Sequence, residues 1–134
     1  MKTKLLTALV LLLVIVTVSA VFAQTKRERA AKEFMRDKLE LTQKILEGLA
    51  TEDYDLMIAK GTQLSAMTKE ANWRLFENPN YDEQSAAFRK QVDALVAAAK
   101  KKNLDAATLA YVRLTMSCVE CHKAVRGKVV ASLR

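Results

Sequence analysis

The chain has 134 residues and a formal net charge of +7, and 28% of its residues are charged. This length suffices for one domain with one hydrophobic core and is too short for two. The positive excess is spread over mixed-sign segments and its one dense cluster is Lys100–Lys102, so the charge pattern carries no nucleic-acid-binding signature.

The first 23 residues have the three-part pattern of a secretory signal peptide. Met1–Lys4 is basic, an apolar run covers residues 5–22, and Ala23 is a small residue before the polar Gln24. We therefore expect cleavage after Ala23, export to the periplasm, and a mature domain of residues 24–134 with a formal charge of +5 and no stable membrane contact. The alternative is an uncleaved anchor, because the apolar run is just long enough to span a bilayer.

The mature part is predicted to be all-α. It contains only three glycines and one proline, while alanine, leucine, lysine and glutamate dominate. Apolar residues recur every three or four positions, the spacing of one helical face, first along residues 25–49. A second such segment follows a helix cap at Thr51 or Asp53 and continues to Phe76.

The only proline separates these two helices from two more. Residues 77–80 around Pro79 form the predicted loop, and Asn80 with Glu83 resembles a capping box for the third helix. The fourth helix begins near Asp105 and weakens at Gly127. The residues predicted to line the core are Phe34, Met35, Leu39, Ile45, Leu46, Leu49, Met57, Leu64, Met67, Ala71, Leu75, Phe88, Val92, Leu95, Val96, Ala99, Leu109, Leu114, Cys118, Cys121 and Val125. Short connections favour an antiparallel up-and-down four-helix bundle.

Residues 118–122 read Cys-Val-Glu-Cys-His, the Cys-x-x-Cys-His signature of covalent haem attachment. On a helix, positions i, i+3 and i+4 share a face. Cys118 and Cys121 can therefore form thioethers to the two haem vinyl groups while His122 ligates the iron. The sequence predicts one haem c.

Three other uses of these two cysteines compete with haem attachment. A structural zinc site takes about four cysteine or histidine ligands, and the chain has two cysteines and one histidine. A thioredoxin-like redox pair requires a βαβ setting, which an all-helical chain does not offer. A plain disulfide suits an oxidising compartment but leaves the adjacent histidine unexplained.

The sixth iron position cannot be a second histidine, because His122 is the only one. It is a methionine, a weaker ligand, or open. The methionines of the mature chain are Met35, Met57, Met67 and Met116, and each could equally be a core residue. Met116 precedes Cys118 on the same helix and cannot reach across the haem, whereas Met35 lies near the start of the first helix, beside the C-terminal end of the fourth in an antiparallel bundle.

The segment 118–126 resembles the C-terminal motif of class II c-type cytochromes, the cytochrome c′ family, including an arginine four residues after the histidine. The resemblance implies a four-helix bundle with one haem near the C-terminus, and Arg126 beside a haem propionate. Residues 34–38 resemble the low-spin branch, which implies Met35 as sixth ligand and makes Arg36 a second propionate candidate. Ala31 stands where high-spin members often carry an arginine, which disfavours gas binding.

Two functions follow from these patterns. The first is a periplasmic single-electron carrier with iron held by His122 and Met35, serving redox partner proteins. The second is a five-coordinate protein that binds nitric oxide or carbon monoxide, with Leu39 covering the open site. We expect no enzyme activity, because no acid–base pocket or second histidine is evident. A haem-bearing module of a respiratory complex is a third reading, and family members often form homodimers through their first two helices.

Overall fold

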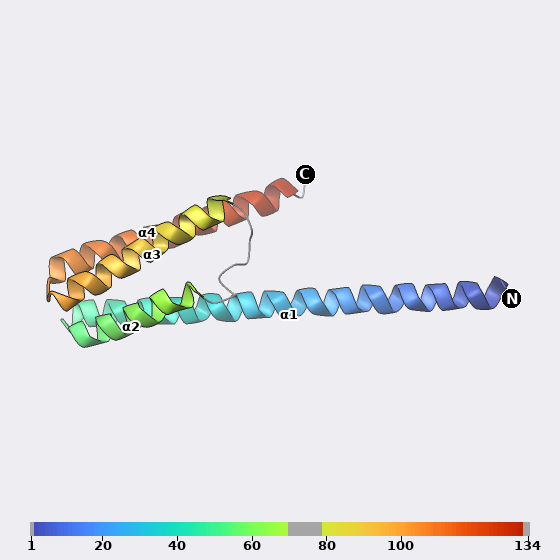
Figure 1. Ribbon diagram of the computed structural model, residues 1–134, viewed down its shortest axis with the longest axis horizontal. Helices are drawn as coiled ribbons and strands as arrows, with labels where there is room; N and C mark the ends of the chain where they lie inside the picture. Colours follow the sequence, from blue (N-terminus) through green and yellow to red (C-terminus); the bar gives the residue numbers. More distant parts are fainter. Residues whose placement is uncertain (1, 70–78, 133–134) are drawn as a thin grey trace. The chain divides into compact units, whose positions relative to one another are not determined.

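The computed structural model describes residues 2–69 and 79–132, although side chains are described for only part of the first 28 residues, not at residues 79 and 80, and not beyond residue 124. Within these ranges it contains four helices and no strand. The helices are α1 (Lys2–Ala50), α2 (Tyr54–Met67), α3 (Pro79–Lys100) and α4 (Leu104–Ser132), shown in Figure 1. The predicted all-α, four-helix architecture is confirmed.

The chain divides into two compact units, residues 1–35 and 36–134. The second unit contains the end of α1 together with α2, α3 and α4, and successive helices in it run in opposite directions (Figure 1). Helix α3 packs against both α2 and α4. This unit carries the Cys-x-x-Cys-His motif, so it is the part of the fold that positions the site.

The first unit lies entirely within α1, which is continuous through Ala23 and Gln24. The predicted first helix therefore extends further toward the N-terminus than residue 25. Cleavage after Ala23 stays a prediction, because a helix can run across a site that a peptidase later cuts. Among the described residues, no helix combines the length and the apolar character that crossing a membrane requires.

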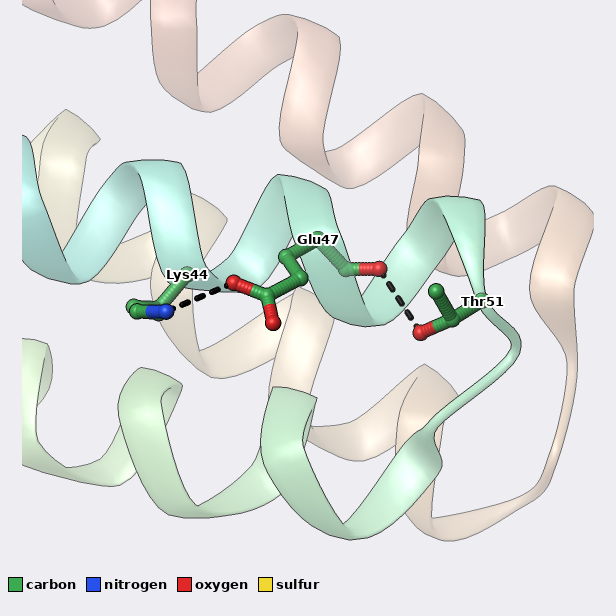
Figure 2. A network of polar contacts seen from close by, with 3 residues as sticks. All are labelled: Lys44, Glu47 and Thr51. Carbon is green, nitrogen blue, oxygen red and sulfur yellow. Dashed lines mark hydrogen bonds and ion pairs between the residues drawn. The ribbon is translucent and has the colours of Figure 1, made fainter.

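A tight turn joins α1 to α2. The predicted cap at Asp53 is confirmed, because its carboxylate accepts a hydrogen bond from the Leu56 N–H at 2.9 Å. Thr51 instead closes the end of α1: its hydroxyl donates to the Glu47 carbonyl at 2.8 Å, and the Glu47 carboxylate accepts from Lys44 at 2.7 Å (Figure 2). Glu52, the residue between Thr51 and Asp53, has a left-handed φ of 54°.

The turn from α3 to α4 is built in the same way. Lys102 has a φ of 52°, and the Asn103 N–H donates back to the Ala98 carbonyl at 3.1 Å, which closes the C-terminus of α3. The Asn103 side chain then caps α4 by accepting from the Ala106 N–H at 2.9 Å. Both turns thus combine a left-handed residue with a following side-chain cap, which fixes where each helical hairpin reverses.

The core of the second unit is formed by the apolar faces of all four helices. Its fully buried members are Ile45, Met57, Leu64, Val92, Leu95, Ala99, Ala107 and Leu114. Helices α2 and α3 approach closely at Gly61, where an added Cβ would lie 2.5 Å from Val96 Cγ2. Nearby, the Ser65 hydroxyl donates to the Asp93 carboxylate at 3.0 Å. Gly61 and the Ser65–Asp93 hydrogen bond together fix how closely α2 and α3 pack.

Several predicted core positions are wrong. Leu39, Leu46 and Leu109 are 57%, 50% and 52% exposed, whereas Val96 is half-buried beside Gly61, as a residue at the edge of the core. Ala107, Ala110 and Ser117 are buried on α4 instead of Leu109. The apolar stripe indicated by the spacing is broader than the face that the neighbouring helices cover, so the residues at its edges remain in solvent. Ala71, Leu75 and Val125 lie outside the residues whose side chains are described.

Three predicted boundaries also differ. Helix α2 ends at Met67, where the Thr68 and Lys69 N–H groups bond three residues back in a tighter turn; residues 70–76 of the predicted helix lie outside the described chain. Pro79 is not in a loop but opens α3, a position where its missing N–H costs nothing, and Asn80 lies inside the first turn, so it is not the cap. Helix α4 continues past Gly127 to Ser132.

Candidate functional site

The Cys-x-x-Cys-His motif lies within the continuous helix α4. Cys118 and Cys121 are half-buried free thiols, and His122 is exposed. Spacings of three and four residues place all three side chains on one face of the helix. Glu120, between the cysteines, points to solvent and pairs with Lys123 at 3.1 Å, an exposed contact of little energetic weight.

The two thiols share a partly apolar environment. Burial raises the pKa of both Cys118 and Cys121, and the nearby positive charge of Lys38 opposes that rise. The thiols are therefore neutral at pH 7. Protonated thiols are poorly suited to binding a metal ion directly, because metal ligation needs thiolates.

Lys38 reaches this site from α1. Its Nζ lies 4.5 Å from the centre of the Phe88 ring on α3, within the range of a cation–π interaction. Burial lowers the pKa of Lys38, and its attraction to Cys118 and Cys121 partly restores it. An ammonium from α1, an aromatic ring from α3 and the two cysteines of α4 thus converge.

Two further residues border the cluster. Tyr111 lies two turns before Cys118 on α4, and burial, aided by the charge of that cysteine, raises the pKa of its phenol. Ser85 lies one turn before Phe88 on α3, and its buried hydroxyl has no hydrogen-bond partner among the described residues. A buried hydroxyl without a partner is costly, and a bound polar group would satisfy it.

The structure says less about the other residues predicted to contact the haem or to ligate its iron. Met35 is half-buried at the end of the first unit, and Arg36 is exposed. The side chain of Arg126 lies outside the described residues, so its predicted propionate contact stays a prediction. Met57 is fully buried and Met67 nearly so, whereas Met116 is 55% exposed on α4.

The donor set of α4 fits a covalently attached haem. Two neutral thiols and one imidazole stand on a single helical face. A zinc site finds no support, since the described residues contain no group of three or more histidine, cysteine, aspartate or glutamate side chains that could hold a metal ion. Neither cysteine is in a disulfide.

The sequence pattern does not single out Lys38, and it assigns Phe88 only to the core. A lysine in a mixed-sign segment is ordinarily read as a solvated residue. The available signal was its spacing, because Lys38 follows Met35 by three residues and so shares its helical face.

A family model described as Cytochrome C' matches residues 21–126, which is most of the chain. The match includes the whole Cys-x-x-Cys-His motif as well as Met35 and Lys38. Proteins of this family carry one covalently attached haem c with its iron. Comparison with curated proteins and comparison with solved structures each gave no significant match.

Proposed function

Because this chain belongs to the cytochrome c′ family, we propose that it is a mono-haem c-type cytochrome that carries single electrons in the periplasm, with His122 and Met35 as iron ligands. The observation that carries the proposal is the placement of Cys118, Cys121 and His122 on one turn of α4. When bound, the haem iron takes up and releases one electron.

Each residue of the motif has a distinct role. Cys118 and Cys121 would hold the cofactor on the helix through thioether bonds to its two vinyl groups. His122 would ligate the iron from the same turn. Because α4 packs along α3, these three groups are held by a rigid helix and not by a loop, which keeps the ligand geometry similar in both oxidation states.

The case for Met35 rests on spacing and on its alternatives. Met57 is fully buried and contacts the end of α1 at Gly48, where it serves as core, and Met116 shares a helix with the motif. Met35 precedes Lys38, a neighbour of both cysteines, by three residues. A methionine opposite histidine raises the reduction potential, which suits an electron carrier.

Gas binding at a five-coordinate iron is the second candidate, because it too belongs to the repertoire of this family. The residue expected to cover an open site, Leu39, is 57% exposed. In either case, we propose a signal peptide of residues 1–23, a domain of residues 24–134, a redox protein as partner of the carrier, and dimerisation through α1 and α2.

The test is the visible absorption spectrum of the mature holoprotein in its ferric and ferrous forms. We expect low-spin bands with a weak far-red methionine-to-iron feature that is lost in Met35→Leu and retained in the matched control Met67→Leu. Loss of the feature in the control alone would make Met67 the ligand. High-spin bands unaffected by either substitution, with ready uptake of carbon monoxide, would establish the gas-binding function instead.

A further inference from the structure

We propose that the solvent-facing side of α4 is an interface at which two copies of this chain pack antiparallel. The surface is the α4 stripe, formed by four exposed apolar side chains: Leu109, Val112, Met116 and Val119. The inference goes beyond the proposed function, because it requires neither a ligated iron nor a redox partner. It also uses other residues than the contact through α1 and α2.

The α4 stripe lies on the side of the helix that faces away from the core. Its members are 44–55% exposed. Successive residues are turned by about 100° around a helix, so the stripe points nearly opposite to the buried residues of α4, which are Ala107, Ala110, Leu114 and Ser117. Cys118 and Cys121 also point away from the stripe, by about 150°. The stripe and the points of haem attachment therefore lie on different faces of α4.

The four side chains form one continuous apolar row. Their spacing of three, four and three residues is that of a seam along which two helices pack. Single exposed apolar residues are ordinary on protein surfaces, whereas a contiguous apolar patch marks a contact with another surface. The row therefore predicts a second helix packed along α4.

Charges at the two ends of the row indicate what that second helix is. Asp105 lies four residues before Leu109, and Lys123 lies four residues after Val119, so both continue the row on the same face. Both charged residues are exposed. Lys123 pairs with Glu120 at 3.1 Å, but its side chain is 68% exposed, so a second carboxylate can reach it. The α4 stripe thus has an acidic end and a basic end.

The row is complementary to itself when reversed. From Asp105 to Lys123 its intervals are 4, 3, 4, 3 and 4 residues, the same from either end. Two antiparallel copies therefore match residue for residue, and the facing pairs are Asp105–Lys123, Leu109–Val119 and Val112–Met116. A parallel pair would place like charges together at both ends, which is unfavourable. Antiparallel packing gives the twofold symmetry usual in homodimers, so a second copy of this chain fits the stripe.

The first test is carbodiimide cross-linking of the holoprotein, followed by mass spectrometry. This reagent joins a carboxylate to an amine that contacts it. Asp105 and Lys123 of one copy are about 27 Å apart along α4, so a link between them forms only between two copies. We expect this link, and the Glu120–Lys123 pair within each copy is the internal control. Dimers that give the control link but no Asp105–Lys123 link would overturn the antiparallel interface.

The second test is sedimentation of the holoprotein and its variants over a range of concentrations. Met116→Glu places a carboxylate in the apolar row at an exposed position, where the helix itself tolerates it, and should raise the dissociation constant at least about tenfold. Lys123→Glu should also raise it, because two carboxylates then face each other, whereas Asp105→Lys combined with Lys123→Glu should return it to within about threefold of wild type. Lys90→Glu makes the same change in charge at an exposed position on α3 and should have no effect.

Leu46→Glu separates the two contacts between copies, because Leu46 is 50% exposed on α1. Dissociation by Met116→Glu and not by Leu46→Glu supports the α4 interface. The reverse result overturns it in favour of contact through α1 and α2. A wild type that stays monomeric, or an equal effect of Lys90→Glu and Lys123→Glu, also overturns it. The proposed function is tested by the absorption spectrum of the holoprotein, so the two proposals stand or fail separately.

Discussion

The Nζ atom of Lys38 lies 4.5 Å from the centre of the Phe88 ring, so a cation of α1 rests on an aromatic side chain of α3. This contact links two helices that are not neighbours in the chain. We predict a coupling energy of about 0.5–2 kcal/mol between the two side chains. A double-mutant cycle with Lys38→Gln and Phe88→Leu, followed by urea unfolding, measures it. Strictly additive changes would show that the ring does not stabilise the ammonium.

The same ammonium controls the reactivity of the cysteines before haem is attached. In a haem-free Cys121→Ser variant, Cys118 is the only thiol, and burial holds its pKa above the ordinary value. Because the thiolate is the nucleophile, alkylation by iodoacetamide should be slow at pH 7 and accelerate as the pH rises past that pKa. Adding Lys38→Gln removes the cation that lowers this pKa, so the rate at a given pH should fall further. Equal rates with and without Lys38 would contradict the contact.

The close approach of α2 and α3 at Gly61 should tolerate no side chain. A Cβ at this position would lie 2.5 Å from Val96 Cγ2. We predict that Gly61→Ala destabilises the fold by about 1–3 kcal/mol, despite the better helix propensity of alanine. The paired variant Gly61→Ala with Val96→Ala should recover most of the free energy of unfolding lost to the clash. If Gly61→Ala instead stabilises the protein, the two helices are further apart than described.

Replacing a left-handed residue of the turns by glycine should stabilise the protein. Lys102 has a φ of 52°, a conformation that costs a residue with a Cβ roughly 1–2 kcal/mol relative to glycine. We predict that Lys102→Gly raises the free energy of unfolding by about 1 kcal/mol. Lys101→Gly is the matched control, because it removes the same charge at a neighbour without a positive φ, and it should not stabilise the protein.

Helix capping gives a fifth prediction. The carboxylate of Asp53 accepts the only side-chain bond that the structure shows at the start of α2, from the Leu56 N–H. Asp53→Ala should therefore lower the free energy of unfolding by about 1 kcal/mol, while Asp53→Asn should retain most of it. Thermal unfolding followed by circular dichroism distinguishes the two variants, and an equal loss in both would point to the charge of Asp53 and not to its hydrogen bond.

Much of the fold could be predicted because helix composition and spacing are local properties. Ile45, Leu64, Leu95 and Leu114 were placed in the core correctly. Adjacent residues lie about 100° apart around a helix, so Ile45 and Leu46 cannot both face the same neighbour. Spacing alone admits either one as the centre of the apolar face. Only the position of the packed helices decides that Ile45 is buried and Leu46 exposed.

The residues of the candidate site likewise include some that the sequence identifies and others that only the packing of the helices reveals. Cys118, Cys121 and His122 are recognisable from five consecutive residues, because the chemistry of attachment is contained in one helical turn. Lys38, Phe88 and Tyr111 join them through packing between three helices, which no local pattern reports. A charged residue that is partly buried is the kind of neighbour that sequence reading misses, since lysine is rarely found away from water.

Confinement of the motif to one turn of α4 has a consequence for how the protein is made. Both cysteines and the histidine can be presented by a short stretch of newly made chain, with no tertiary structure to bring distant segments together. The cofactor can thus be loaded before the bundle assembles, and the covalent bonds keep it on the chain through any later unfolding. The side chains of α1 and α3 then pack around a haem that is already attached. Assembly of the bundle thereby becomes a step in the maturation of the protein.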